Sequence, residues 1–194
     1  MIKNKILICI FVVFFAISAN AKDDFPYYGK LDPAPKIVVQ VFSSLTCPYC
    51  ADFHLNVLPK LLKKYVSNQK MLIKHMDFPL DLPGLKAAQI QKCLPLETQK
   101  SYLDEIYKTQ PQWNTAKTLK ELESNIEKIT SKLGLQGKDF QDCLKNKKNE
   151  DAVLQNRIKA QSKYEIDATP TLIINEKKFK GSTKELEKYL DKLL

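Results

Sequence analysis

Two cysteines three positions apart are the residues of this chain whose types and spacing point most directly to chemistry. Cys47 and Cys50 occur in residues 42–54, "FSSLTCPYCADFH". An apolar run precedes them and a helical pattern follows. Such a pair can be a redox centre that reacts with other proteins, half of a metal site, or a small structural cross-link.

The cross-link and metal interpretations account poorly for this pattern. On the chain-entropy model a closed loop of about four residues contributes only roughly 2 kcal/mol, whereas a loop of about fifty contributes roughly 4. A structural zinc site needs four ligands at recognisable spacings. The C-x-x-C motif stands alone, and His54 and His75 belong to no partner motif, so we expect no metal.

The position of the pair favours the redox interpretation. A cysteine at a helix N-terminus meets unpaired backbone N–H groups and the positive end of the helix dipole, which favour the thiolate and lower its pKa. We therefore expect Cys47 to be the exposed attacking sulfur. Cys50 lies one turn inside the helix and should resolve the mixed disulfide. Pro48 and Tyr49 between them should influence the stability of the thiolate, and with it the redox potential.

A second feature is the dipeptide Thr169-Pro170, at the start of the apolar segment "TPTLIIN". Proline at the first position of a strand can simply mark the start of an edge strand. If the bond is cis, as we expect, it forms a fixed turn that brings the backbone of Thr169 next to the cysteines. That backbone could then pair with an extended substrate chain.

The N-terminus has the pattern of a secretory signal peptide over residues 1–21. Lys3 and Lys5 give a positive start, residues 6–17 are apolar, and Ala19 and Ala21 form a small-residue cleavage site. The apolar run is short for a bilayer span, which favours a cleaved signal peptide. An uncleaved membrane anchor is the alternative. Cleavage would leave four of the five cysteines. An even number on an exported chain suits an oxidising compartment such as the periplasm.

The charge of the chain does not indicate a nucleic-acid partner. The formal net charge is +9, but the lysines are scattered over predicted helical faces. A nucleic-acid protein would cluster them, often among aromatic residues.

The order of predicted elements defines the fold class. Residues 22–35 look like an irregular lead-in, and residues 37–43 read as a buried strand. A helix should start at Cys47 or Pro48, and Pro59 should kink it. Residues 71–78 read as a second strand. Residues 84–164 are almost entirely helical, and a strand pair at "TPTLIIN" and "KKFKG" precedes a closing helix.

This order predicts an α/β protein with a thioredoxin fold. A helix between two strands makes those strands parallel, while the short turn near Asn175 makes the last pair antiparallel. We expect a mixed four-stranded sheet with helices on both faces and an inserted helical subdomain. The expected divisions are a signal peptide (1–21), a β-α-β half (22–83), the insertion (84–164) and a β-β-α half (165–194).

The mature chain resembles the DsbA-like thiol:disulfide oxidoreductases of bacterial envelopes, the alphaproteobacterial type most closely, within the thioredoxin superfamily. The motifs that carry the resemblance are "SLTCPYCADFH", "DFPLD", "AAQIQKC", "FQDCL" and "ATPTLIIN". It implies oxidation of newly exported, reduced proteins, in which substrate thiolate attacks Cys47 and the electrons remain on Cys50. It also implies a quinone-linked membrane reoxidase, DsbB-like in type, and no cofactor.

Three features depart from that pattern. Family members commonly carry a buried acidic residue six positions before the first active cysteine, where this chain has Val41. Proton transfer from Cys50 would then use water or another group. The Pro48-Tyr49 dipeptide is typical of glutaredoxins, and Thr169 before the proline resembles the isomerase branch. However, we expect no separate dimerisation domain before the fold, which argues against a dimeric isomerase.

Three further residues have two interpretations each. Cys93 and Cys143 lie in predicted insertion helices and are expected to form a structural disulfide, with two free buried thiols as the alternative. His54 follows Cys47 by two helical turns. It could act near the thiolate or simply pack at the helix surface.

We therefore expect an exported, monomeric oxidoreductase that introduces disulfide bonds into proteins through Cys47 and Cys50, with Thr169 and Pro170 shaping the peptide-binding edge. A reductase or isomerase of the same fold is one alternative, because the sequence does not fix the redox potential. A redox-inert secreted binding protein is the other.

Overall fold

The computed structural model describes residues 25–194. The predicted signal peptide, and the uncleaved anchor that was its alternative, lie outside the described residues. Within the described part, no helix has the length and apolar character needed to cross a bilayer.

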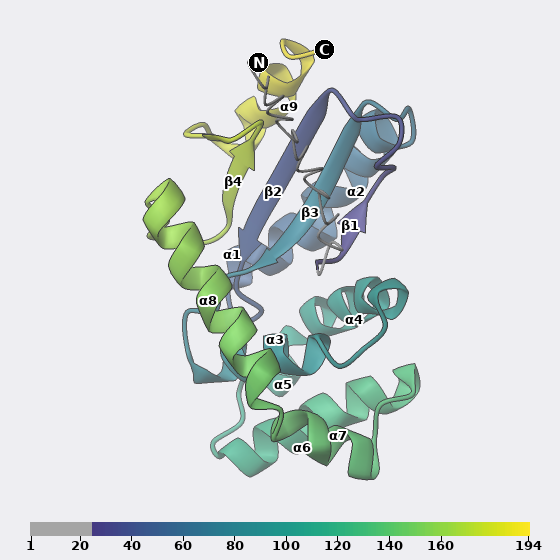
Figure 1. The fold of residues 1–194 in the computed structure, drawn as a ribbon, viewed down its shortest axis with the longest axis vertical. Helices are drawn as coiled ribbons and strands as arrows, with labels where there is room; N and C mark the ends of the chain where they lie inside the picture. Colours follow the sequence, from purple (N-terminus) through teal and green to yellow (C-terminus); the bar gives the residue numbers. More distant parts are fainter. Residues whose placement is uncertain (1–24) are drawn as a thin grey trace, which may run out of the picture.

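A mixed sheet forms the upper half of the molecule (Figure 1). Its strand order is β1-β3-β2-β4-β5. Neighbouring strands β2 and β3 are parallel and the other pairs are antiparallel. The strands are β1 (Tyr27–Tyr28), β2 (Ile37–Ser43), β3 (Met71–Asp77), β4 (Thr171–Ile174) and β5 (Lys177–Lys178).

The sheet has five strands among the described residues, so the expected four-stranded sheet is wrong. The additional strand is β1, within the segment that the sequence indicated to be irregular. Tyr27 pairs with Lys74 and Tyr28 with Ile73 on the outer side of β3. A two-residue strand is too short to show the alternating pattern of a strand in the sequence. Its pairing depends on a strand edge that only the folded sheet provides.

One long helical segment covers one face of the sheet. It begins at Pro48, as expected, and runs without interruption through α1 (Pro48–Asp52), η1 (Phe53–Val57), α2 (Leu58–Leu61) and η2 (Leu62–Val66). Both η segments are wider π-type turns. The first directly precedes Leu58-Pro59, where proline cannot donate a backbone hydrogen bond. Helix α9 (Thr183–Asp191) packs beside this segment, with Leu186 and Leu190 in the same buried cluster.

The remaining helices lie between β3 and β4 in the chain. They are α3 (Leu82–Gln91), α4 (Leu96–Lys108), α5 (Gln110–Trp113), α6 (Leu119–Thr130), η3 (Ser131–Leu133), α7 (Gly137–Leu144) and α8 (Lys147–Tyr164). Helices α3 to α7 form a group below the sheet, and α8 runs from that group back up to the sheet (Figure 1). The C-terminal part of α8 packs on the opposite face from α1, where Ala160 contacts a cluster with Phe42 and Ile173. The expectation of a mixed sheet with helices on both faces is confirmed.

A disulfide links the end of α3 to α7. It joins Cys93 to Cys143, the pairing expected from the sequence. Gln89 reinforces the same junction, because its Nε2 donates to the carbonyl oxygens of Cys143, Leu144 and Asn146. These contacts hold the C-terminal end of α7 against α3.

Candidate functional site

Cys47 and Cys50 lie at the junction between the sheet and the helical group. Cys47 is the N-cap residue of α1, in an extended conformation with φ −79° and ψ 121°. Its carbonyl oxygen accepts hydrogen bonds from the backbone N–H groups of Cys50 and Ala51. Both cysteines are buried, with Cys47 7% exposed and Cys50 only 1%. The expected exposure of Cys47 is therefore wrong, although Cys47 is the more accessible of the two.

Several donors stabilise a thiolate on Cys47. A hydrogen bond from the Cys50 side chain is the largest cause, and it lowers the Cys47 pKa from 9.0 to about 5. Burial opposes this change, while the Thr169 side chain and the backbone N–H groups of Cys50 and Tyr49 add to it. Oγ1 of Thr169 has no hydrogen-bond partner, so the Cys50 side chain and the backbone N–H groups are the main donors to the Cys47 sulfur.

The pKa of Cys50 changes in the opposite direction. Burial is the largest cause and raises it far above the ordinary value, and the adjacent Cys47 raises it further. The two sulfurs therefore differ strongly: Cys47 carries a thiolate at neutral pH, and Cys50 holds its proton.

Side chains from the helical group hold the loop before Cys47. Nε2 of Gln110 donates to the carbonyl oxygens of Leu45 at 2.8 Å and Cys47 at 3.1 Å. Nδ2 of Asn114 donates to the carbonyl oxygen of Thr46 at 3.4 Å. Because these carbonyls belong to an irregular loop, no neighbouring strand can satisfy them. Sequence analysis missed Gln110 and Asn114, and no local motif identifies them.

The start of α3 supports the loop from another side. The Thr46 hydroxyl donates to Asp81 Oδ1 at 3.1 Å. Asp81 is the N-cap residue of α3, and the same oxygen accepts a hydrogen bond from the backbone N–H of Gly84. Ser44 Oγ lies 2.9 Å from Thr46 Oγ1 and accepts the backbone N–H of Leu80.

The Thr169–Pro170 segment faces the cysteines. Its peptide bond is cis, which confirms that expectation. The carbonyl oxygen of Thr169 lies 3.3 Å from Cys47 Sγ. The segment directly precedes β4, whose partner β2 leads into the cysteine loop.

The surface around Cys47 is partly apolar. Tyr49 is 75% exposed, and Leu80 and Leu82 are also exposed. Pro48 is exposed beside Tyr49. Phe78, in contrast, is buried in the sheet core.

His54 is buried within η1. Its Nε2 lies 2.7 Å from Asp104 Oδ1 on α4, and its ring packs against Tyr107 at 4.9 Å between centroids. This arrangement corresponds to the packing interpretation of His54. Among residues 25–194, no group of three or more His, Cys, Asp and Glu side chains is arranged to hold a metal ion.

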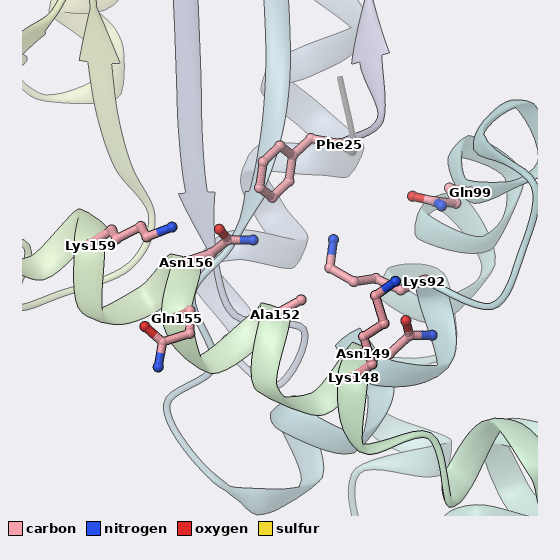
Figure 2. A pocket seen from close by; sticks show the side chains of 9 residues that line it. All are labelled: Phe25, Lys92, Gln99, Lys148, Asn149, Ala152, Gln155, Asn156 and Lys159. Atoms are coloured by element: carbon pink, nitrogen blue, oxygen red, sulfur yellow. The ribbon is translucent and has the colours of Figure 1, made fainter. Parts of the chain in front are cut away.

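Figure 2 shows a cleft whose lining includes neither Cys47 nor Cys50. It has a volume of about 440 Å³ and is lined by Phe25, lysines and amide side chains of α3, α4 and α8. No residue predicted to take part in the chemistry lines it.

Comparisons with known proteins identify the family. The family model described as "Thioredoxin" matches residues 23–192. The crystal structure of Wolbachia pipientis alpha-DsbA1 superposes with a TM-score of 0.78 at 30% identity, covering 89% of this chain and 92% of that one. The chain belongs to the thioredoxin superfamily and, within it, to the DsbA-like thiol:disulfide oxidoreductases.

Curated relatives carry names of the same kind. A Rickettsia bellii protein named "Putative protein-disulfide oxidoreductase" is 26% identical over 72% of this chain and 53% of its own length. The Bacillus anthracis "Probable disulfide bond formation protein D" is 28% identical over 97% of this chain and 91% of that protein. The chain spans about half the length of the Rickettsia relatives that it matches.

Proposed function

We propose that this protein is an exported thiol:disulfide oxidoreductase that introduces disulfide bonds into protein substrates through Cys47 and Cys50. The observation that carries the proposal is the contrast between the two sulfurs: the pKa of Cys47 is lowered to about 5 and that of Cys50 is raised. A stabilised thiolate favours the reduced form of the pair, so the oxidised form readily accepts electrons.

The reaction follows from this asymmetry. A substrate thiolate attacks Sγ of Cys47, the Cys47–Cys50 bond breaks, and its electron pair passes to Cys50, which takes up a proton. A second substrate thiolate then attacks the substrate sulfur of the mixed disulfide. The substrate gains a disulfide, and Cys47 leaves as a thiolate, which its low pKa favours.

Four residues beside Cys47 would bind the substrate chain. Thr169 and Pro170 would present an edge on which an extended peptide adds as a strand. Pro48 and Tyr49 would contact the substrate from the other side, since both are exposed next to Cys47. The Cys93–Cys143 disulfide would be structural, because Cys143 is buried away from solvent.

We also propose that the protein is exported and acts with two kinds of partner protein. We assign residues 1–21 to a cleaved signal peptide, 84–164 to a helical insertion, and residues 22–83 and 165–194 to the two halves of the fold. The substrates would be reduced exported proteins in the periplasm, and a quinone-linked membrane protein would reoxidise the pair. The protein would act as a monomer without a cofactor.

The test is equilibration of the mature chain with glutathione buffers, with the Cys93–Cys143 disulfide left intact. We expect a reduction potential near the DsbA value of about −120 mV. A value near that of thioredoxin, about −270 mV, would contradict the oxidase and favour a reductase. A pair that does not exchange with glutathione would leave only the redox-inert binding protein.

A second assay follows oxidation of a reduced peptide that carries two cysteines. Cys47→Ser should abolish the oxidation. A Cys93→Ala/Cys143→Ala double variant is the matched control and should retain it. Mass spectrometry of the exported chain should find the mature form beginning at Lys22, whereas retention of residues 1–21 would support the anchor.

A further inference from the structure

A small cavity with both polar and apolar walls lies beside Cys50. Its volume is about 10 Å³, which is about the room that one water molecule needs. Besides Cys50, its walls include Ser43, His54, His75 and Tyr107. Titratable side chains, among them His54, His75 and Tyr107, therefore share this cavity with Cys50.

The sheet register places His75 opposite the helix that carries Cys50. His75 on β3 pairs with Val41 on the parallel strand β2, so both side chains project from the same face. Val41 belongs to the buried cluster that also contains Phe53 of the covering helical segment. His75 thus projects toward that helix and, like Cys50, lines the cavity.

His75 is also part of a buried charge arrangement. Its Nε2 has no hydrogen-bond partner and lies 3.4 Å from Asp77 Oδ1. Asp77 is 2% exposed, and neither of its carboxylate oxygens has a hydrogen-bond partner. A buried carboxylate is costly unless a cation is close. Asp77 lies between two nitrogen-bearing side chains, His75 and Lys92.

We infer that His75 is the buried proton donor to Cys50, and that Asp77 positions its imidazole ring. This inference rests on the proposed function and deepens it. When substrate thiolate attacks Cys47, the disulfide breaks and Cys50 becomes a thiolate. The imidazolium gives its proton to that thiolate across the cavity, leaving neutral His75 and the Cys50 thiol.

The other titratable groups around the cavity fit this role less well. Nε2 of His54 already contacts Asp104, whose side chain is 67% exposed. Burial raises the pKa of Tyr107 and of Tyr28, so both hydroxyls keep their protons at neutral pH. They can orient a proton path but cannot supply the proton.

Lys92 links Asp77 to the 440 Å³ cleft. Nζ of Lys92 lies 3.7 Å from Asp77 Oδ2. Lys92 also lines the 440 Å³ cleft, where its side chain lies near Phe25 and α8 (Figure 2). Tyr102 adjoins Asp77 as well, and burial and that carboxylate raise its pKa. Water in the cleft can therefore restore the proton after each turnover.

The test measures how fast reduced glutathione attacks the oxidised full chain, expressed per glutathione thiolate, from about pH 5 to about pH 8, the range in which histidine changes charge. We expect the wild-type rate to fall across this range as the donor loses its proton. His75→Asn should lower the rate by about a hundredfold at the acidic end, the lower range for a positioned acid, and flatten the profile. Asp77→Asn should lower the rate at neutral pH.

His54→Asn is the matched control and should keep the wild-type profile. A wild-type profile in both the His75 and Asp77 variants would overturn the inference, as would loss of the profile in the His54 variant. A general loss of stability would not flatten the pH profile of folded protein, and Asp77→Asn keeps the test valid if His75→Asn does not fold. If the wild-type chain does not exchange with glutathione, the proposed function itself fails.

Discussion

Acidification should remove a specific part of the stability of the reduced protein. The relevant group is the Cys47 thiolate, which exists only when the Cys47–Cys50 pair is reduced. Hydrogen bonds from Cys50 and the helix N-terminus lower its pKa from 9.0 to about 5. The unfolded chain loses those donors, so its thiol regains the ordinary pKa.

The size of the effect follows from linkage. A group whose pKa is lowered on folding stabilises the folded state fully above its unfolded pKa, and the contribution is lost as the pH falls through the folded value. Each pH unit between the two values corresponds to about 1.4 kcal/mol. At pH 7, two units above the folded pKa of about 5, the thiolate contributes about 3 kcal/mol. This contribution should be nearly absent at about pH 4.

The assay compares denaturant unfolding of the reduced and the oxidised chain at several pH values. Carboxylates titrate in both forms, so their contribution cancels in the difference between the two free energies of unfolding. That difference should change by about 3 kcal/mol between about pH 4 and pH 7, with the reduced form relatively more stable at pH 7. The ultraviolet absorbance of the thiolate, with Cys47→Ser as the blank, should titrate with a midpoint near 5.

Two results would refute this reasoning. A titration midpoint near the ordinary cysteine value of 9.0 would show that the helix N-terminus and Cys50 do not stabilise the thiolate. A reduced-minus-oxidised difference that stays constant from about pH 4 to pH 7 would show that the thiolate does not contribute to folding.

The other predictions concern the contacts that surround the pair. Replacing both cysteines of the α3–α7 disulfide with alanine should lower the free energy of urea unfolding by about 4 kcal/mol, from a loop of about fifty residues, without preventing glutathione exchange at the active pair; an unchanged unfolding midpoint would contradict this. Gln110→Met leaves two loop carbonyls without their donor and should cost about 2–4 kcal/mol, whereas Gln112→Met, at an exposed position of the same short helix, should be nearly neutral. Gln89→Met removes four hydrogen bonds, three that Nε2 donates and one that Oε1 accepts from Lys86, and should cost about 2–4 kcal/mol. Gln91→Met, on the same helix with a buried and unpaired amide, should be neutral or stabilising. Equal losses for Gln89→Met and Gln91→Met, which are both buried, would show that burial and not hydrogen bonding determines the cost. Equal losses for Gln110→Met and Gln112→Met would contradict a stabilising role of the Gln110 hydrogen bonds.

The sequence by itself determined the elements that local patterns encode. Residues 37–43 are β-branched and apolar, and they form β2 with those bounds. Proline at position 48 favours a first helical turn, and α1 begins there. Each of these signals lies within a few residues of the feature that it specifies.

The tertiary structure decided the features that depend on distant segments. Strand β1 exists only because β3 offers an edge. Gln110 reaches the cysteine loop across 63 residues of chain, and nothing in its neighbourhood marks it. The pairing of Val41 with His75 depends on strand register, and a slip of one residue would turn His75 to the opposite face. Local patterns thus define the reactive cysteines, whereas packing between distant segments decides which groups stabilise the Cys47 thiolate and which can supply a proton to Cys50.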